Sequence, residues 1–358
     1  MPATTGMKGA GYYDRHSAVQ LSSIQALQGW VDDAIAGLPL PPPRQPVTVL
    51  DLGSAEGGNA VRLMAAVVAG LRGRTGRPIQ TVYSDLPGND FNRLFANLEG
   101  AHRTGLLAAG VYPGAVAGSF YGPLLPPGTV HLATCFNALQ WLDRLPAVPL
   151  PDVVYRRPHP PRPGLAVSPQ VAAAFRRQAE QDLVRFLESR ARELVPGGKL
   201  LLASPGDTDQ ARVADGVADL LNDACLDLVA AGRLGRDQYE RLTLPCYWRT
   251  VEELLAPLER EGPPVSGAFV AERAQALEVP TPFVLKLRRG GDVAAYAAAY
   301  TGFLRAVTEP VVRASLDEPE EDVGTVDRLY ERVRARLLAE PERYSWRYIL
   351  VAALLTRR

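Results

Sequence analysis

The chain has 358 residues, with 39 Lys and Arg against 39 Asp and Glu, so its formal net charge is zero. Hydrophobic residues make up 47% and charged residues 22%, which is typical of a folded globular protein and excludes collagen-like and wholly disordered chains. The charge balance also argues against nucleic-acid binding, which depends on a surplus of basic residues.

The cysteines and the apolar runs indicate the cellular compartment of the protein. Cys135, Cys225 and Cys246 are widely spaced without a CxxC pair, so we expect a reducing compartment, no disulfide framework and no bound metal. The N-terminus lacks the apolar segment of a signal peptide, and no apolar run approaches the roughly 20 residues that span a bilayer. We therefore predict a cytoplasmic protein without membrane or nucleic-acid partners.

The first half of the chain alternates helical and strand patterns. A helix is predicted over 17–38, which stops at Pro39, and others over 59–71 and 171–194. Short β-branched or apolar runs predict strands over 47–50, 80–84, 114–118, 129–135 and 199–203. This alternation predicts an α/β fold with a mostly parallel, doubly wound sheet.

Beyond Pro205 helical patterns dominate. They cover 209–231, 250–261 and a pair after 292, while 265–272, 283–287 and the apolar run 348–355 are candidate core strands. The segment 150–169, rich in proline and arginine, predicts a loop. We expect a core over 1–206, a helical cap over 207–261 and 292–344, and remaining core strands in 262–291 and 345–358.

A glycine-containing turn follows the strand at 47–50 and is a candidate cofactor site. Its sequence, DLGSAEGGN from Asp51 to Asn59, fits neither G-x-G-x-x-G nor the P-loop. A strand that ends in an acid and then glycine is the usual opening of S-adenosylmethionine-dependent methyltransferases, whose cationic cofactor favours a carboxylate such as Asp51 or Glu56. A tight turn without a ligand is the alternative.

A second acid, Asp85, ends the strand at 80–84. A carboxylate there can accept hydrogen bonds from both ribose hydroxyls of an adenosine cofactor. Taken alone, Asp85 could equally be a turn-capping residue.

Several motifs together resemble the SABATH family, the plant-type carboxyl and N-methyltransferases. Besides DLGSAEGGN, they are DLPGNDFN at 85–92, GSFY at 118–121, CFNALQWL at 135–142, and an opening match over 7–20. Later similarities extend to 310, so the resemblance runs nearly end to end. It implies a class I, Rossmann-like methyltransferase fold with a helical cap, S-adenosylmethionine as cofactor and a homodimer, and we expect a microbial member.

The resemblance also implies a set of cofactor-binding residues. Those expected around the methionine part are Tyr13, Ser17, Asp51, Gly53 and Asn59. Asp85 and Leu86 would hold the ribose and adenine, and the adenine side would be lined by Ser119, Phe120, Cys135 and Asn137. Two of these residues could instead be structural, Ser17 as a helix N-cap and Phe120 as a core aromatic.

Gln20 and Trp141 match the two family positions whose side chains hydrogen-bond a substrate carboxylate. A carboxylate is already ionised near neutral pH and needs no general base, so neutral donors that position it are sufficient. The alternatives are a solvated helix residue for Gln20 and a core aromatic for Trp141. Trp248 and Tyr348 are candidate walls of the substrate site, and core packing would account for them equally well.

Three departures from the family pattern concern the substrate, one of which is Asn137 in place of a Tyr that lines the site. Gln140 stands where carboxyl methyltransferases of the family commonly have His, and its amide suits either a carboxylate or a heterocycle. His16 replaces an Asn, either as a structural substitute or as a proton acceptor. We predict methyl transfer to the carboxylate of a small, mostly apolar acid, giving a methyl ester. N-methylation of a purine-like heterocycle and a non-catalytic cofactor-binding protein are the alternatives.

Overall fold

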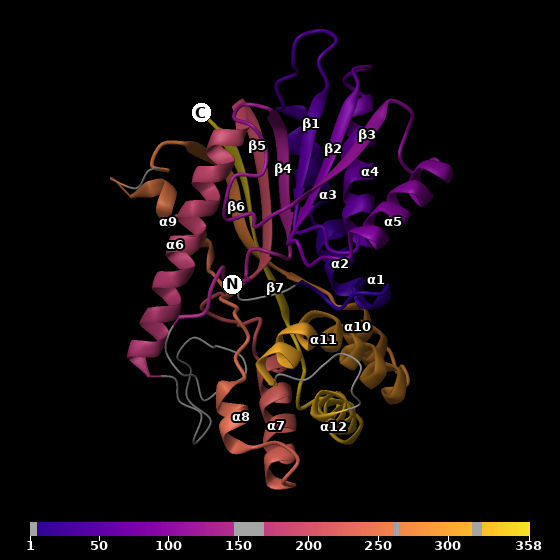
Figure 1. The fold of residues 1–358 in the computed structure, drawn as a ribbon, viewed down its shortest axis with the longest axis vertical. Coiled ribbons are helices and arrows are strands. Elements are labelled where there is room, and N and C mark those ends of the chain that lie inside the picture. The colour runs from indigo at the N-terminus through magenta and orange to yellow at the C-terminus, as the bar shows by residue number, and fades with distance from the viewer. Residues whose placement is uncertain (1–5, 147–167, 261, 263–264, 317–323) are drawn as a thin grey trace.

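A computed structural model describes residues 6–146, 168–260, 262, 265–316 and 324–358. Most of the predicted loop 150–169 therefore lies outside the described residues. Seven strands form one sheet in the order β3-β2-β1-β4-β5-β7-β6 (Figure 1). Their bounds are β1 Val47–Leu52, β2 Ile79–Asp85, β3 Val111–Ala117, β4 Val130–Phe136, β5 Leu194–Pro205, β6 Phe269–Val279 and β7 Tyr348–Arg357.

The first five strands pair in parallel, and β7 lies antiparallel between β5 and β6. The predicted α/β class with a mostly parallel, doubly wound sheet is confirmed. Neighbouring residues of a strand pack into the hydrophobic cores on opposite faces of the sheet, because side chains alternate across a sheet. Val49 belongs to the core on one face and Leu50 to the core on the other, and Leu132 and Ala133 divide in the same way.

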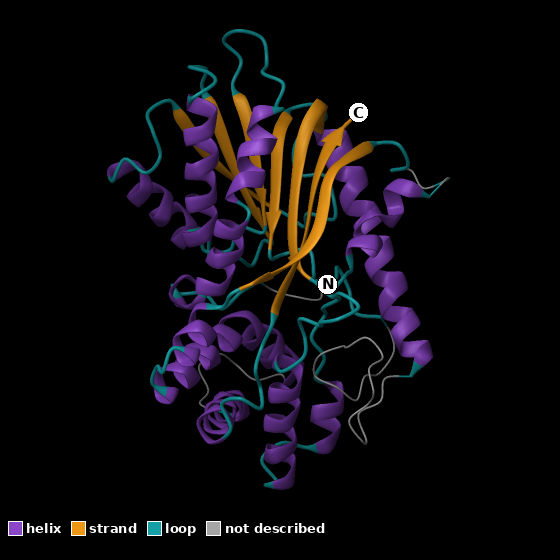
Figure 2. Cartoon of the chain, turned by 180° about the vertical axis from the view of Figure 1, so that it is seen from behind, coloured by secondary structure: helices purple, strands orange, loops and turns teal. Residues whose placement is uncertain are grey.

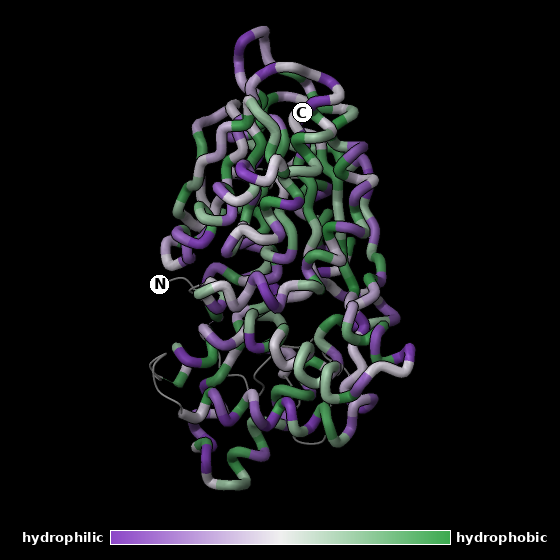
Figure 3. Tube along the Cα trace, turned by 90° about the vertical axis from the view of Figure 1, so that its right-hand side faces the viewer, coloured by the Kyte–Doolittle hydropathy of each residue, from purple (hydrophilic) through white to green (hydrophobic). Residues whose placement is uncertain are grey.

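Helices cover both faces of the sheet and gather at one of its ends (Figure 2). Their bounds are α1 Tyr12–His16, α2 Ala18–Ala26, α3 Gln28–Ala36, α4 Gly58–Arg72, α5 Phe91–Arg103, α6 Pro169–Glu193, α7 Val217–Ala230, α8 Arg236–Arg241, α9 Val251–Glu259, α10 Pro282–Arg288, α11 Val293–Leu316 and α12 Thr325–Ala339. Helices α3, α4 and α5 lie on one face, and α6 and α9 on the other. Hydrophobic stretches occur both in the half of the molecule that contains the sheet and in the half below it (Figure 3).

Helices α7, α8, α10, α11 and α12 form a cap below the ends of the strands, and α1 and α2 lie between this cap and the sheet (Figure 1). Helix α12 packs on both α7 and α11, and α10 packs on α11. Of the described helices, none is long and apolar enough to cross a membrane.

Several predicted elements differ from the observed ones. The segment 283–287 is not a strand but part of α10, which begins with Pro282 in its first turn, and its apolar run was too short for periodicity to separate helix from strand. The helix predicted over 209–231 begins only at Val217, after Gly216 with its positive φ of 81°. The helix predicted over 17–38 is divided at Leu27 into α2 and α3.

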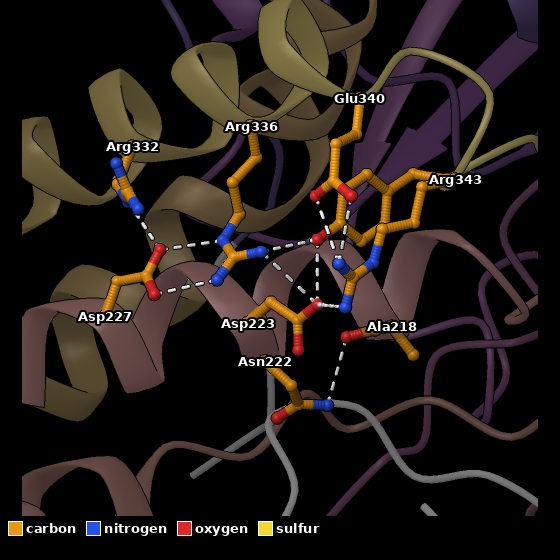
Figure 4. Close-up of polar contacts among 9 residues, drawn as sticks. Ala218, Asn222, Asp223, Asp227, Arg332, Arg336, Glu340 and Arg343 are labelled. Atoms are coloured by element: carbon orange, nitrogen blue, oxygen red, sulfur yellow. Dashed lines mark hydrogen bonds and ion pairs between the residues drawn. The ribbon is translucent and has the colours of Figure 1, made fainter. Parts of the chain in front are cut away.

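A polar network fixes α7 against α12 and the loop that follows it (Figure 4). Asp227 accepts hydrogen bonds from Arg332 and, at 2.7 Å for each carboxylate oxygen, from Arg336. One turn earlier in α7, Asp223 accepts a bond from the hydroxyl of Tyr344 at 2.7 Å. The network holds α7 in place, and the first turn of this helix contributes Val217 to the larger cavity described below.

Candidate functional site

Two cavities adjoin where the parallel strands end and the cap begins. The strand-end cavity, with about 640 Å³ of empty space, is lined by residues that include Gly53, Ala55, Asp85, Leu86, Ser119 and Phe120. The cap cavity, with about 700 Å³, is lined by residues that include Gln20, Gln140, Val217, Trp248, Phe303, Trp346 and Tyr348. Four residues line both cavities, namely Met7, Tyr13, Asn137 and Trp141. These four mark the junction at which two bound molecules would meet.

The turn after β1 brings the backbone close to its neighbours. Gly53 has a φ of 84°, and a Cβ added there would lie 2.5 Å from the Cβ of Ala138, so both its conformation and its surroundings require glycine. Gly53 and Ala55 line the strand-end cavity, whose wall is therefore bare backbone at this point.

Asp51, the last but one residue of β1, is 4% exposed and does not line the cavity. Its two carboxylate oxygens accept hydrogen bonds from the hydroxyls of Ser54 and Thr134, at 2.8 Å each. Burial raises the pKa of Asp51 to about 6, against the effect of these two bonds. The end of β1 therefore contains a carboxyl group that is costly to ionise in the free protein.

Asp85 ends β2 and is at the wall of the strand-end cavity. One carboxylate oxygen accepts the backbone N–H of Ala55 and the other that of Leu86, at 2.7 Å each, and burial raises the pKa of the group. Each oxygen keeps an unused lone pair, because a carboxylate oxygen can accept two bonds. Asp85 is thus positioned as an acceptor for a ligand hydroxyl.

The residues of the DLPGNDFN motif have different structural roles. Asn89 donates from its side-chain amide to the carbonyl of Ala55 at 2.8 Å, which ties the turn after β2 to the turn after β1. Asp90 accepts the N–H of Arg93 and caps α5. Only Asp85 and Leu86 of this string line the cavity.

The loop that carries Ser119 and Phe120 is held by a buried ion pair from α6. Arg190 donates to the carbonyls of Phe120 and Gly122, at 2.8 and 2.9 Å, and pairs with Glu193. Glu193 in turn accepts backbone N–H groups from the same loop. Phe120 lines the strand-end cavity with one side and packs at 5.8 Å, ring to ring, against Phe186 with another. Both of its possible roles, as a cavity wall and as a core aromatic, are therefore observed.

The N-terminal segment closes over the junction. Glu56, which is 1% exposed, accepts the backbone N–H groups of Gly11 and Asp14. Its carboxylate anchors this segment. Of the two acids considered for a cationic ligand, Glu56 is therefore already engaged by the protein's own backbone. Asn59 donates to the carbonyl and hydroxyl of Ser17, at 3.0 and 2.9 Å, and neither residue lines the two cavities.

The cap cavity is mostly apolar and collects all five residues expected at the substrate end. Gln20 comes from α2, Trp141 and Gln140 follow β4, Trp248 precedes α9, and Tyr348 opens β7. Trp141 is 8% exposed, and its backbone forms a bridge with Cys246. The Oε1 atom of Gln20 is buried without a hydrogen-bond partner among the described residues.

The structure therefore brings most of the expected residues together but separates a few. Seven of the expected cofactor residues line the strand-end cavity, namely Tyr13, Gly53, Asp85, Leu86, Ser119, Phe120 and Asn137. Ser17, Asp51, Asn59 and Cys135 do not line it. Cys135 is fully buried in β4 among apolar side chains, and burial raises the pKa of its thiol. Ser17 stands at the N-cap position of α2 without a capping side-chain bond.

Sequence reasoning missed most of the apolar lining. Met7 and Ala55 fall in motifs that the sequence identifies, but the cap contributes Val213, Val217, Leu244, Phe303, Leu304 and Trp346, which no motif indicates. Amphipathic spacing predicts that such residues are buried. It does not distinguish a side chain that fills the core from one that faces a cavity.

Comparison with known proteins decides the family. The family model described as SAM dependent carboxyl methyltransferase matches residues 3–358. The chain belongs to this family of carboxyl methyltransferases. It is thus an S-adenosylmethionine-dependent enzyme, and the resemblance to the SABATH family is confirmed.

Individual carboxyl methyltransferases and related enzymes match over most of their length. Indole-3-acetate O-methyltransferase 1 of Oryza sativa subsp. japonica is 30% identical over 320 residues, which cover 81% of this chain and 75% of that protein. O-methyltransferase acrG of Aspergillus aculeatus is 29% identical over 357 residues, covering 93% and 91%. A structure of loganic acid methyltransferase with SAH has a TM-score of 0.80 at 23% identity, covering 98% of both chains, which shows the same fold.

The strand-end cavity fits the cofactor of a carboxyl methyltransferase. Its glycine turn leaves room for a ligand against the backbone, the remaining lone pairs of Asp85 would accept ribose hydroxyls, and Leu86 and Phe120 would offer apolar surface to adenine. Asp51, which is buried and bonded to Ser54 of the turn, would supply negative charge for a cationic group.

Proposed function

We propose that this carboxyl methyltransferase converts a small acid with a single charged group and a mostly apolar body into its methyl ester. The observation that carries the proposal is the lining of the cap cavity. All of the described residues that line it are uncharged, and most are apolar side chains, among them Val217, Leu244, Phe303 and Trp346. A second charge on the substrate would be buried there without a partner, at a large energetic cost.

The acid end of the substrate would bind at the junction. Trp141 lines both cavities and Gln20 lines the cap cavity beside Tyr13 and Asn137, so donors from these side chains can hold a carboxylate next to the strand-end cavity. The unsatisfied Oε1 of Gln20 shows that its amide is not fully used by the described part of the protein. An amide can turn by 180° at little steric cost, which would direct an N–H to a carboxylate at this position.

The cap cavity also lacks a proton acceptor among its described residues. Burial raises the pKa of Tyr13, Tyr348 and Cys246, so these groups stay protonated at neutral pH and act as donors or apolar walls. A carboxylate can react under these conditions because it is already ionised, whereas a substrate that must lose an N–H proton would need a base.

His16 does not supply that base. Its Nδ1 lies 2.8 Å from the carbonyl oxygen of Tyr12, and its ring faces a different cavity, beside Phe283 and Tyr296. This placement supports the interpretation that His16 is a structural substitute for the family's Asn and not a proton acceptor.

When bound, S-adenosylmethionine supplies an electrophilic methyl group on a sulfonium. The task of the chain in catalysis is to orient one carboxylate oxygen toward that methyl and to exclude water. Met7, Tyr13 and Trp141 line both cavities and are suited to orienting the acid and to excluding water.

N-methylation of a heterocycle is the second candidate, and it depends on Gln140. Its Nε2 donates to the carbonyl of Asn137 at 2.8 Å, and its Oε1 accepts from the hydroxyl of Ser204 at 3.2 Å. Because both ends of the amide are engaged by the protein, it is less suited to read the edge of a purine than a free amide would be.

The test is S-adenosylhomocysteine release by the purified protein with aromatic acids, aliphatic acids, dicarboxylic acids and purines, with the product's mass and base lability recorded. We expect a base-labile gain of one methyl from monocarboxylic acids and little turnover of dicarboxylic acids. A base-stable methyl on a purine would establish the second candidate.

We also propose a homodimer in a reducing, cytoplasmic environment. The resemblance to the family supports the dimer. Cys135, Cys225 and Cys246 are all free and buried, which supports a reducing compartment. Sedimentation of the purified protein tests the first expectation.

A further inference from the structure

Asn137 occupies the junction of the two cavities and has an unusual backbone conformation. It follows β4 directly, and its φ of 56° lies in the left-handed region, which Asn adopts more readily than most residues. Its backbone N–H donates to the carbonyl of Ala203 in β5 at 2.7 Å. The position of this residue is therefore set by the end of the sheet.

The carbonyl of Asn137 fixes the amide of Gln140. A carbonyl oxygen can only accept, so the nitrogen of the Gln140 amide must face it, and the 2.8 Å contact shows this arrangement. The amide oxygen then points to the hydroxyl of Ser204, which lies 3.2 Å away and 3.3 Å from the carbonyl of Pro205. The orientation of Gln140 thus follows from the chemistry of its neighbours.

The side chain of Asn137 connects two further elements. Its Oδ1 accepts the hydroxyl of Tyr348, at the start of β7. Its Nδ2 donates to the hydroxyl oxygen of Ser23 at 2.8 Å, and the Ser23 hydroxyl donates to the carbonyl of Gln20 at 2.7 Å. Tyr348 and the backbone of Gln20 are therefore joined through one amide.

We infer that Asn137 is a positioning residue, which holds Gln20, Gln140 and Tyr348 in register at the junction and so sets the geometry of methyl transfer. These three side chains line the cap cavity from α2, the segment after β4 and β7, and Asn137 bonds directly or through Ser23 to each of these elements. Displacing a reacting group by about 1 Å can cost on the order of 100-fold in rate. The inference rests on the proposed function, because it assumes that the acid binds at these side chains.

The first variant is Asn137→Gly. Glycine adopts the left-handed conformation freely and keeps the carbonyl that binds Gln140, so only the bonds to Tyr348 and Ser23 are lost. We expect kcat for the preferred acid to fall about 10- to 100-fold, while the dissociation constant for S-adenosylhomocysteine, measured by calorimetry, stays the same. The control is Arg44→Gly. Arg44 is exposed, has a φ of 73° and lines neither cavity, so this substitution should leave kcat unchanged.

Two results would overturn the inference. One is an unchanged kcat in a folded Asn137→Gly variant. The other is a loss of S-adenosylhomocysteine binding in proportion to kcat, which would make Asn137 a cofactor ligand instead.

A double-mutant cycle separates positioning from a general structural effect. Tyr348→Phe removes only the hydroxyl that donates to Asn137, and Ser23→Ala removes the hydroxyl that links Asn137 to the carbonyl of Gln20. Each should lower kcat severalfold in the native background, and Tyr348→Phe should have no further effect in the Asn137→Gly background. Losses that multiply independently would contradict a shared network.

The cycle also covers a folding failure of Asn137→Gly, because Tyr348→Phe and Ser23→Ala leave Asn137 in place. In that case unchanged kcat in both single variants would refute the inference. The proposed function fails separately: a base-stable product from the native enzyme would reject ester formation, while the ratio of variant to native kcat would still decide the role of Asn137.

Discussion

The buried carboxyl of Asp51 leads to a prediction about pH and stability. Its pKa is about 6 in the folded chain against an ordinary value of 3.8, which corresponds to about 3 kcal/mol of preference for the protonated form. In this range the folded state binds more protons than the unfolded state, so raising the pH through 6 lowers the free energy of unfolding. Between pH 5 and pH 8 the loss is about 1.4 kcal/mol, because only the interval from pH 5 to the folded pKa contributes.

The perturbation is Asp51→Asn, which keeps the shape and removes the titration. Urea unfolding of the ligand-free protein at pH 5, 6, 7 and 8 should show the variant gaining about 1.4 kcal/mol relative to the native protein over this range. Asp209→Asn, a substitution at an exposed loop residue, is the control and should follow the native curve. Parallel curves for Asp51→Asn and the native protein would refute the assignment.

The same variant should bind S-adenosylmethionine more weakly, since it lacks the negative charge behind the glycine turn. Asp51 would then be an example of a group that lowers the stability of the free protein in exchange for ligand binding. Unchanged affinity would show that the charge of Asp51 does not reach the cofactor.

Four other substitutions test the site. Trp141→Phe and Gln20→Leu each remove a neutral donor, so kcat/KM for the acid should fall about 10- to 100-fold while S-adenosylhomocysteine affinity persists; equal loss of both would show that these roles were misassigned. Asp85→Asn should act in the opposite way and weaken S-adenosylhomocysteine binding at least about 10-fold in calorimetry, and an unchanged affinity would contradict its ribose role. Arg190→Met leaves the Glu193 carboxylate buried without its partner, so urea unfolding should show a loss of about 3–5 kcal/mol; Arg190→Met combined with Glu193→Leu should recover part of it, and no recovery would show that an unpaired buried charge is not the cause.

Local sequence was sufficient to predict those parts of the site that each lie within a single turn. Gly53 and Asp85 follow strands whose parallel arrangement could be predicted, and the ends of parallel strands meet at one edge of a sheet. The strand order places β2 beside β1, so the two turns had to lie together. Local sequence was misleading where an apolar run was short, as in α10, which was predicted as a strand.

Other assignments depended on long-range contacts. Glu56 was as good a candidate as Asp51 for a cationic ligand, but it binds the backbone of Gly11 and Asp14, more than forty residues earlier. Cys135 lies in a motif of the family, yet the alternation of β4 directs it into the core. Gln140 suits a heterocycle by residue type alone, but its contacts with Asn137 and Ser204 engage both ends of the amide.

The sequence by itself determined the family, the doubly wound sheet and the two acids at the ends of its first strands, because each of these depends on residues close together in the chain. Only the tertiary structure decided the wall of the cap cavity and the role of Asn137. The wall is built by side chains from α7, α11 and β7, and Asn137 binds Ser23 and Tyr348, which are 114 and 211 residues away. Contacts of this kind are set by how the cap packs on the sheet, and no local pattern records them.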